Sequence, residues 1–454
     1  MAFQELYVRP GGSNLNAGSE NTDAARLTYA SGTWVKATGV FTVASGDPVA
    51  DGVVVGDLAS IYADGASVTV SVGRVTARTT TTITILVDVT TGSGTTPSDG
   101  TSNRTVKIGG AWRGPNAAVA FPFGFVTTYL RSVSASSGCP RVNFLNSSTY
   151  SITAAMSHNV GGGNVVFEGM TATPGDGGVA IIDGGTSGAS YVLLDILGTA
   201  DNTVLRNITF QNNGATGSAS GLTLNAQAPE CVLDNVVVHD VRGWGIVVAG
   251  ATPTTLIGCE TYNCNQSNTA GLGGMDVSSA SVIECQSHNN NGIGIRYGNT
   301  GTGNGATLLM DSQCWENTSH GFAANNHRSP VIIHGCFGWD NGGSGLFDDG
   351  SGAQQATVVI EYCVFELNDL YGMNLGGSGA NSCFVLRSNA FYNNTSGDVN
   401  PPGLVTDIAS CVIETGRITL SAEAFEDPGN GDFNINNDAG GGAVLRAVTF
   451  TIGA

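Results

Sequence analysis

The sequence predicts an all-β protein: a right-handed parallel β-helix, or solenoid, of about 25 residues per coil with a small N-terminal β module. Three observations predict it. A glycine followed by an apolar residue recurs at this spacing, a second apolar strand precedes each glycine, and turn-forming residues separate the two strands. No long stretch has the 3.6-residue apolar period of an amphipathic helix.

The repeat is clearest in the second half of the chain. Its glycines are Gly221, Gly245, Gly274, Gly294, Gly321, Gly345 and Gly372, with a mean spacing of about 25 residues. Turns such as 289–292 are rich in Asn and Gly, which tolerate the left-handed backbone of a sharp corner. One coil cannot bury its apolar face alone, so coils stack about 4.8 Å apart and form a continuous core.

Composition agrees with a folded solenoid. The 66 glycines accompany 41% apolar and only 12% charged residues, which indicates many turns around a core rather than disorder. The net charge of −19 leaves no basic stripe, so we expect no nucleic-acid partner. The start lacks a basic, apolar leader and no run is long enough to span a bilayer, so we expect no secretion signal and no membrane partner.

Four segments follow from these patterns. Residues 1–36 form a strand and loop that open the β-helix, and residues 37–113 form a Thr/Val-rich β module inserted after that first strand. Alternation within 68–72 and 82–85 predicts antiparallel strands in the module. Residues 114–420 form the β-helix, and 421–454 supply closing strands.

Cysteines recur once per repeat at Cys259, Cys285, Cys336 and Cys363. This spacing predicts a buried ladder of reduced, small apolar side chains. Disulfides and a metal site are the alternatives, although no Cys-x-x-Cys pair supports zinc.

Both ends of the chain resemble pectate-lyase-like β-helix proteins. Residues 6–18 combine Tyr7-Val8 with a Gly-Ser and Asn-rich loop, and residues 427–436 contain a Gly-Asp-Phe closing strand. The closing 438–443 stretch lacks the Ser-Pro-Ala pattern of the secreted enzymes and is closer in character to β-helix structural proteins of tailed bacteriophages.

The resemblance implies two enzyme chemistries. Hydrolases of this fold use paired aspartates, but the motifs of polygalacturonases do not occur here. Lyases use calcium together with a basic residue that removes the proton next to a uronate carboxyl. The lyase candidates are Asp276, Arg296, His288, His239 and Asp240. Asp276 and Arg296 occupy equivalent positions in neighbouring coils, so a structural ion pair is the alternative, and the histidines could lie in solvated turns.

Three tryptophans recur near turns: Trp244, Trp315 and Trp339. If their rings are exposed, they form a sugar-binding platform. If buried, they fill corners of the coils, and Trp315 and Trp339 stack on each other.

The predicted function is a bacteriophage virion structural protein: a capsid decoration protein, head fibre or tail spike. We expect a homotrimer without a cofactor, attached to other virion proteins through residues 37–113 and adhering to host-surface polysaccharide. One alternative is a polysaccharide lyase with calcium. Another is a non-catalytic carbohydrate-binding protein in the extracellular space.

Overall fold

The computed structural model describes most of the chain. It covers residues 4–9, 20, 22–64, 70–90, 99–113, 140–146, 149–158, 165–197, 202–225, 230–249, 253–298, 306–324, 329–348, 357–375, 383–400 and 412–447. The loop of the opening motif, residues 10–18, lies outside these ranges. The chain divides into two compact units, one made of 1–183 with 199–208 and the other of 184–198 with 209–454.

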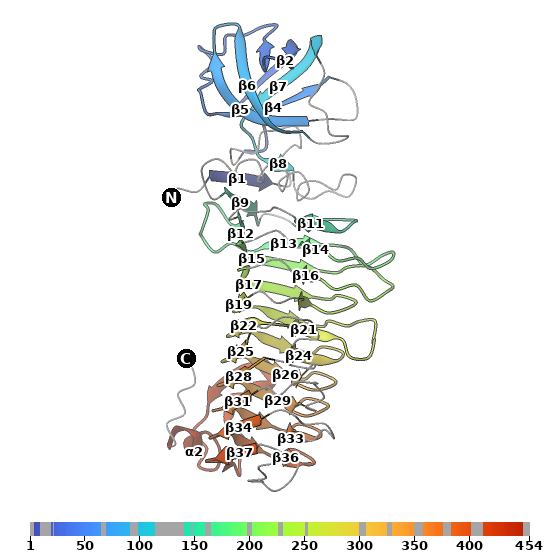
Figure 1. Cartoon of the computed structure of the whole chain (residues 1–454), viewed down its shortest axis with the longest axis vertical. Helices are drawn as coiled ribbons and strands as arrows, with labels where there is room; N and C mark the ends of the chain where they lie inside the picture. The colour runs from blue at the N-terminus through green and yellow to red at the C-terminus, as the bar shows by residue number, and fades with distance from the viewer. Residues whose placement is uncertain are drawn as a thin grey trace. The chain divides into compact units, whose positions relative to one another are not determined.

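The second unit is a parallel β-helix, as predicted (Figure 1). The solenoid has about 8 turns of about 27 residues. The first strand stack contains β19 (Thr254–Ile257), β22 (Ala280–Ile283), β25 (Thr307–Met310), β28 (Val331–His334), β31 (Thr357–Glu361), β34 (Cys383–Arg387) and β37 (Val412–Thr415). The second contains β20 (Glu260–Tyr262), β23 (Gln286–His288), β26 (Gln313–Trp315), β29 (Phe337–Trp339), β32 (Val364–Glu366), β35 (Ala390–Tyr392) and β38 (Ile418–Thr419). β17 (Val232–His239) pairs with both β19 and β20.

A third strand stack closes each coil. It contains β14 (Leu194–Ile196), β16 (Leu222–Leu224), β18 (Ile246–Val248), β21 (Gly273–Val277), β24 (Ile293–Tyr297), β27 (Phe322–Ala324), β30 (Leu346–Phe347), β33 (Tyr371–Asn374) and β36 (Gly397–Asn400). Alternate residues of every stack point inward. On the first stack one inward column consists of fully buried residues: Leu256, Val282, Leu309, Ile333, Ile360 and Leu386. Their alignment from coil to coil forms the continuous core that the repeat predicts.

The cysteines lie at the corner between the first and second stacks. Each of Cys259, Cys285, Cys336 and Cys363 is fully buried and unpaired, and follows a residue in the left-handed conformation. In the intervening coil the equivalent position holds Ser312, whose hydroxyl accepts the N–H of Cys285 at 3.2 Å. The predicted ladder of reduced cysteines is confirmed in the described residues.

An asparagine ladder lines the corner between the second and third stacks. Its members are Asn290, Asn317, Asn341, Asn368 and Asn394. The side-chain amides of the first four donate to the Oδ1 of the next member at 2.9 to 3.0 Å, and these four are no more than 1% exposed. The predicted Asn-rich turns are therefore buried hydrogen-bonded columns, and they satisfy backbone groups at the corner.

The recurring glycines lie beside this ladder, either just before a third-stack strand or at its second residue. A Cβ atom on Gly321 would come within 2.8 Å of the Gly345 carbonyl oxygen and 2.9 Å of the Asn341 amide. The glycine repeat therefore arises from close packing between coils.

The first unit contains a closed antiparallel barrel and the opening coils. The barrel order is β2 (Leu27–Val35), β3 (Val40–Thr42), β6 (Thr82–Thr90), β5 (Val70–Arg78), β4 (Leu58–Ala63) and β7 (Gly100–Ile108). Its own core includes Trp34, Phe41 and Ile83. The barrel begins at Leu27 rather than at residue 37, because β2 pairs with both β3 and β7.

The barrel is inserted within the first coil. β1 (Gln4–Arg9) pairs in parallel with β8 (Trp112–Arg113), which follows the barrel, and with β9 (Pro140–Leu145). The remaining strands of this unit are β10 (Tyr150–Ser151), β11 (Met156–His158), β12 (Val165–Met170) and β13 (Ala180–Asp183), and β15 (Thr203–Gln211) continues into the second unit.

The C-terminal segment, residues 421–447, covers part of the second stack. It contains β39 (Phe425–Asp427), the 3-10 turn η1 (Pro428–Asn430), β40 (Asp432–Ile435) and the short helix α2 (Gly442–Ala447). Phe425 and Phe433 pack against Phe337, with ring centroids 5.0 and 6.0 Å away. The expected closing strands are present, and they cap a side of the solenoid.

Candidate functional site

The third stack carries an ion pair in neighbouring coils. Asp276 of β21 and Arg296 of β24 lie opposite each other. The Nε and Nη2 atoms of Arg296 donate to the two carboxylate oxygens of Asp276 at 2.9 and 2.5 Å. The guanidinium also lies 4.6 Å from the ring centroid of Trp244 and donates from Nη1 to the Gly271 carbonyl at 3.3 Å. Asp276 and Arg296 therefore form a structural ion pair, which was the alternative to a lyase site. The cation–π contact with Trp244 strengthens this pair.

This arrangement engages both groups that a lyase would need. Both oxygens of Asp276 accept hydrogen bonds from Arg296, and three guanidinium nitrogens of Arg296 already face acceptors or the Trp244 ring. A substrate carboxylate would have to displace Asp276 to be neutralised. The pair therefore holds adjacent coils together in this conformation.

The second stack carries a ladder of stacked rings on its outer side. His239 stacks on Tyr262 at 4.5 Å and 5°, and Tyr262 on His288 at 5.3 Å and 14°. His288 stacks on Trp315 at 4.1 Å and 9°. Strand pairing places these four residues at the same register position in successive coils. Because each ring covers the face of the next, the stack presents ring edges to the solvent.

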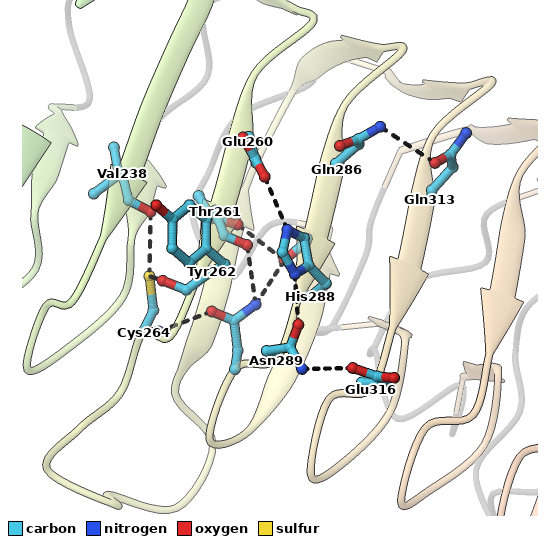
Figure 2. A network of polar contacts seen from close by, with 12 residues as sticks. Val238, Glu260, Thr261, Tyr262, Cys264, Gln286, His288, Asn289, Gln313 and Glu316 are labelled. Atoms are coloured by element: carbon cyan, nitrogen blue, oxygen red, sulfur yellow. Dashed lines mark hydrogen bonds and ion pairs between the residues drawn. The ribbon is translucent and has the colours of Figure 1, made fainter. Parts of the chain in front are cut away.

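Polar side chains surround the ring edges (Figure 2). The Nε2 atom of His288 lies 2.9 Å from a Glu260 carboxylate oxygen, and Nδ1 lies 2.7 Å from the Asn289 amide oxygen. The Asn289 amide donates to Glu316 at 2.6 Å. Both nitrogens of His288 thus face an oxygen of the protein, so neither is open to a substrate in this conformation.

The neighbouring histidine faces an oxygen in the same way, and the neighbouring tyrosine lies close to two carboxylates. His239 Nδ1 lies 2.7 Å from a carboxylate oxygen of Asp240. Burial, followed by the negative charges of Glu260 and Asp240, raises the pKa of Tyr262, so its hydroxyl stays protonated and can donate or accept.

The tryptophans do not form an open platform. Trp244 and Trp315 are only 4% and 5% exposed. Trp315 packs between His288 and Phe433, and Trp339 donates from Nε1 to Glu423 of the C-terminal segment at 2.9 Å. Trp315 and Trp339 occupy equivalent positions in β26 and β29, and their stacking on each other stays a prediction. The exposed alternative is wrong for Trp244 and Trp315, because side chains from the next coil or the C-terminal segment cover their rings.

The five catalytic candidates belong to two different strand stacks. Asp276 and Arg296 lie on the third stack, whereas His239 and His288 belong to the second and Asp240 to the turn that follows β17. Spacing along the chain cannot reveal this separation, because every coil contributes one strand to each stack. Glu260 and Tyr262 were missed, although Tyr262 occupies the repeat position between the two histidines.

A buried carboxyl group marks the contact with the C-terminal segment. Glu366 of β32 is 0% exposed, and its oxygens accept the N–H of Ala424 at 3.1 and 3.4 Å. Burial raises the pKa of Glu366 to about 8. Burial lowers the pKa of His320 to about 4, so its neutral ring accepts the Ser344 N–H at Nδ1, 2.9 Å away. Glu366 and His320 thus each bond a backbone N–H group of the fold, at separate places in the solenoid.

Two further observations bear on ligands. Within the ranges given above, no three His, Cys, Asp or Glu side chains lie together in a way that could hold a metal ion. Calcium therefore stays a prediction without assigned ligands. In the same ranges, no helix is long and apolar enough to cross a membrane.

Comparison with known proteins agrees with the fold. Residues 220–396 match the family model described as the right handed beta helix region. The structure resembles pectate lyase Pel9A with a TM-score of 0.51 and 14% identity, over 68% of this chain and 84% of that one. The chain is thus a right-handed parallel β-helix protein.

Two other solved structures are more distant. The A-module of the Azotobacter vinelandii mannuronan C-5 epimerase AlgE4 has a TM-score of 0.46 and 14% identity, over 64% of this chain and 89% of that one. The tailspike of Acinetobacter phage vB_ApiP_P1 has a TM-score of 0.44 and 11% identity, over 72% and 62%. No curated protein sequence matches the chain. Likeness at these identities concerns the fold and assigns no activity.

Proposed function

We propose that this chain is a structural protein of a phage virion that attaches through its N-terminal module and presents the β-helix to host-surface glycans without cutting them. The observation that carries the proposal is the insertion of a closed barrel into the first coil, between β1 and β8. A module with its own core, inserted at the start of a solenoid, suits attachment, while the repetitive coils suit presentation.

The barrel has side chains suited to a protein contact. Val54, Val55 and Leu86 are 48%, 63% and 61% exposed, so the module presents aliphatic side chains to its surroundings. This supports the assignment of residues 37–113 to contacts with other virion proteins.

The outer edge of the second stack is the proposed glycan surface. Its partly exposed side chains are Glu260, Tyr262, Gln286, His288 and Gln313. Hydroxyl, amide and carboxylate groups can bond sugar hydroxyls, whereas the ring faces are occupied by one another. With a net charge of −19, the chain should prefer neutral or amino sugars to polyuronates.

A glycan-binding comparison tests this surface. We expect the full-length protein to bind immobilised neutral glycans, and Tyr262→Phe to weaken binding at least about tenfold, because it loses a hydroxyl that bonds the sugar. Tyr371→Phe, which alters a partly exposed tyrosine on the third stack, is the matched control. Equal binding by both variants would reject this surface, and release of unsaturated products from a polyuronate would establish a lyase instead.

Attachment is tested separately. Antibody raised against the chain should label particles in negative-stain micrographs of a phage lysate that contains it. Particles without label, in a lysate where the protein is free in solution, would contradict the virion assignment.

A further inference from the structure

An apolar stripe runs along the outer side of the first stack. Strand pairing aligns its five residues in successive coils: Leu308, Ile332, Val359, Val385 and Ile413. They alternate with the inward core residues, so they point away from the core. Ile332 and Ile413 are 41% and 54% exposed, and the other three are partly exposed.

The stripe is not used by the C-terminal segment. That segment packs on Trp315, Phe337 and Val364 of the second stack, and no member of the stripe belongs to this cluster. A row of aliphatic side chains on an outer sheet face is costly to leave in water, and such patches typically mark protein contacts.

The charges beside the stripe are compensated. Two residues after the stripe, each strand has another outward-facing position. At this position Glu361 lies 3.2 Å from His334 of the preceding coil and 3.6 Å from Arg387 of the following coil. The chain as a whole carries a net charge of −19, so two copies repel each other over most of their surface. The stripe therefore offers a row of apolar side chains beside a paired carboxylate, which makes it suitable for association between like chains.

We propose that the stripe binds the same stripe of a second copy of this chain, with the two solenoids parallel and their coils level. The stripe presents one side chain per coil, and another solenoid with the same rise matches that repeat along its whole length. Identical chains commonly associate through such repeated, self-matching surfaces.

The column of aligned residues that contains the stripe favours the parallel arrangement over the antiparallel one. In the N-terminal direction the column continues with the polar residues Ser281 and Thr255. Parallel copies place polar against polar and aliphatic against aliphatic residues. In an antiparallel pair whose columns overlap fully, Ile413 would face Thr255 instead. The inference is independent of the proposed function, because it needs neither a glycan nor a virion.

Light scattering and sedimentation of the full-length protein test the surface. We expect a mass that is a multiple of the 46.1 kDa monomer, and at least a tenfold weaker association for Ile332→Asp. Leu370→Asp is the matched control, because Leu370 is also 41% exposed but lies outside the stripe. A monomeric wild type at all concentrations, or an Ile332→Asp oligomer as strong as wild type, would overturn the proposal.

Cysteine cross-linking gives a second readout that does not depend on weakening the interface. The test uses a Cys383→Ser background, because the Cys383 side chain is itself partly exposed beside the stripe. In the parallel arrangement, Ile332→Cys and Val359→Cys should each form an interchain disulfide under mild oxidation, and Leu370→Cys and the background protein should not.

In an antiparallel pair centred on the stripe, Val359 would still meet Val359 but Ile332 would meet Val385. In the antiparallel pair with fully overlapping columns, Ile332 would meet Ile332 and Val359 would meet Leu308. Cross-linking at only one of the two positions would therefore overturn the parallel arrangement, and cross-linking at neither position would overturn the surface.

Discussion

Glu366 and Ala424 join the solenoid to its C-terminal segment. The Glu366 carboxyl group is buried in the second stack and accepts the N–H of Ala424 at 3.1 and 3.4 Å. Burial, with the negative charge of Glu423 adding to it, raises the pKa of Glu366 from 4.5 to about 8. The neutral acid is therefore the form that fits beneath the segment.

Stability should depend on pH through this group. The folded pKa lies above the unfolded one, so the folded state binds more protons between pH 4.5 and about 8. The contribution of Glu366 is then most favourable below pH 4.5 and is lost as the pH rises to about 8, at a cost on the order of 5 kcal/mol. Glu366→Gln should melt at a higher temperature than wild type at pH 9 and show no such advantage at pH 4.5.

The exposed Glu426 of the same segment provides the control. Glu426→Gln should follow the wild-type melting curve at both pH values. If Glu366→Gln also followed it, Glu366 would not be the titrating group.

The Asp276–Arg296 pair should contribute to stability through its geometry. Arg296→Lys keeps the charge but loses the two-pronged contact with Asp276 and the planar contact with Trp244, so we expect a loss of about 1 kcal/mol, seen as a lower melting temperature. Arg387→Lys is the control, since the Arg387 side chain is 58% exposed and lies 3.6 Å from its partner. If both substitutions lowered the melting temperature equally, the two-pronged contact of Arg296 with Asp276 would contribute nothing to stability.

The asparagine ladder should be among the most sensitive parts of the solenoid. Asn341→Ala removes the acceptor of the Asn317 amide and the donor to Asn368, leaving buried polar groups without partners. We expect a loss of roughly 2–4 kcal/mol, measured as a fall in melting temperature. The exposed Asn434, changed to Ala in the same way, should have little effect. A similar melting temperature for both variants would contradict this.

Cysteine reactivity should follow burial. Burial raises the pKa of Cys336 well above its usual value and excludes reagent, whereas Cys383 is partly exposed. Brief alkylation of the native protein, mapped by mass spectrometry, should modify Cys383 well before Cys336. Modification of both at the same rate would show that the corner opens readily, and labelling in denaturant controls for intrinsic reactivity.

Much of the coil could be predicted from local pattern. Periodic glycine and aliphatic residues report burial directly, because each coil must bury one face and approach its neighbour closely, as Gly321 does. The corners were only partly predictable. Glu284, Tyr362 and Leu367 adopt the left-handed conformation, although they are neither Asn nor Gly. Stacking of neighbouring coils imposes the same backbone on each corner, whatever residue occupies it.

In the candidate site, too, the sequence pattern predicts some contacts and the packing of coils decides the others. The pairing of Asp276 with Arg296 follows from equal spacing after a glycine, but the position of Trp244 beside Arg296 depends on how three coils pack. Likewise, His239 and His288 are equivalent by repeat, yet their partners Asp240, Glu260 and Asn289 depend on the rotamers adopted.

The sequence by itself determined that this chain is a β-helix with a separate N-terminal β module, because both follow from periodic burial along the chain. Only the tertiary structure decided that the catalytic candidates lie on two stacks, that Trp315 is covered by Phe433, and that Glu366 is buried beneath Ala424. Those contacts join residues far apart in the chain, and their distances depend on how coils and the C-terminal segment pack in space, which no spacing along one chain encodes.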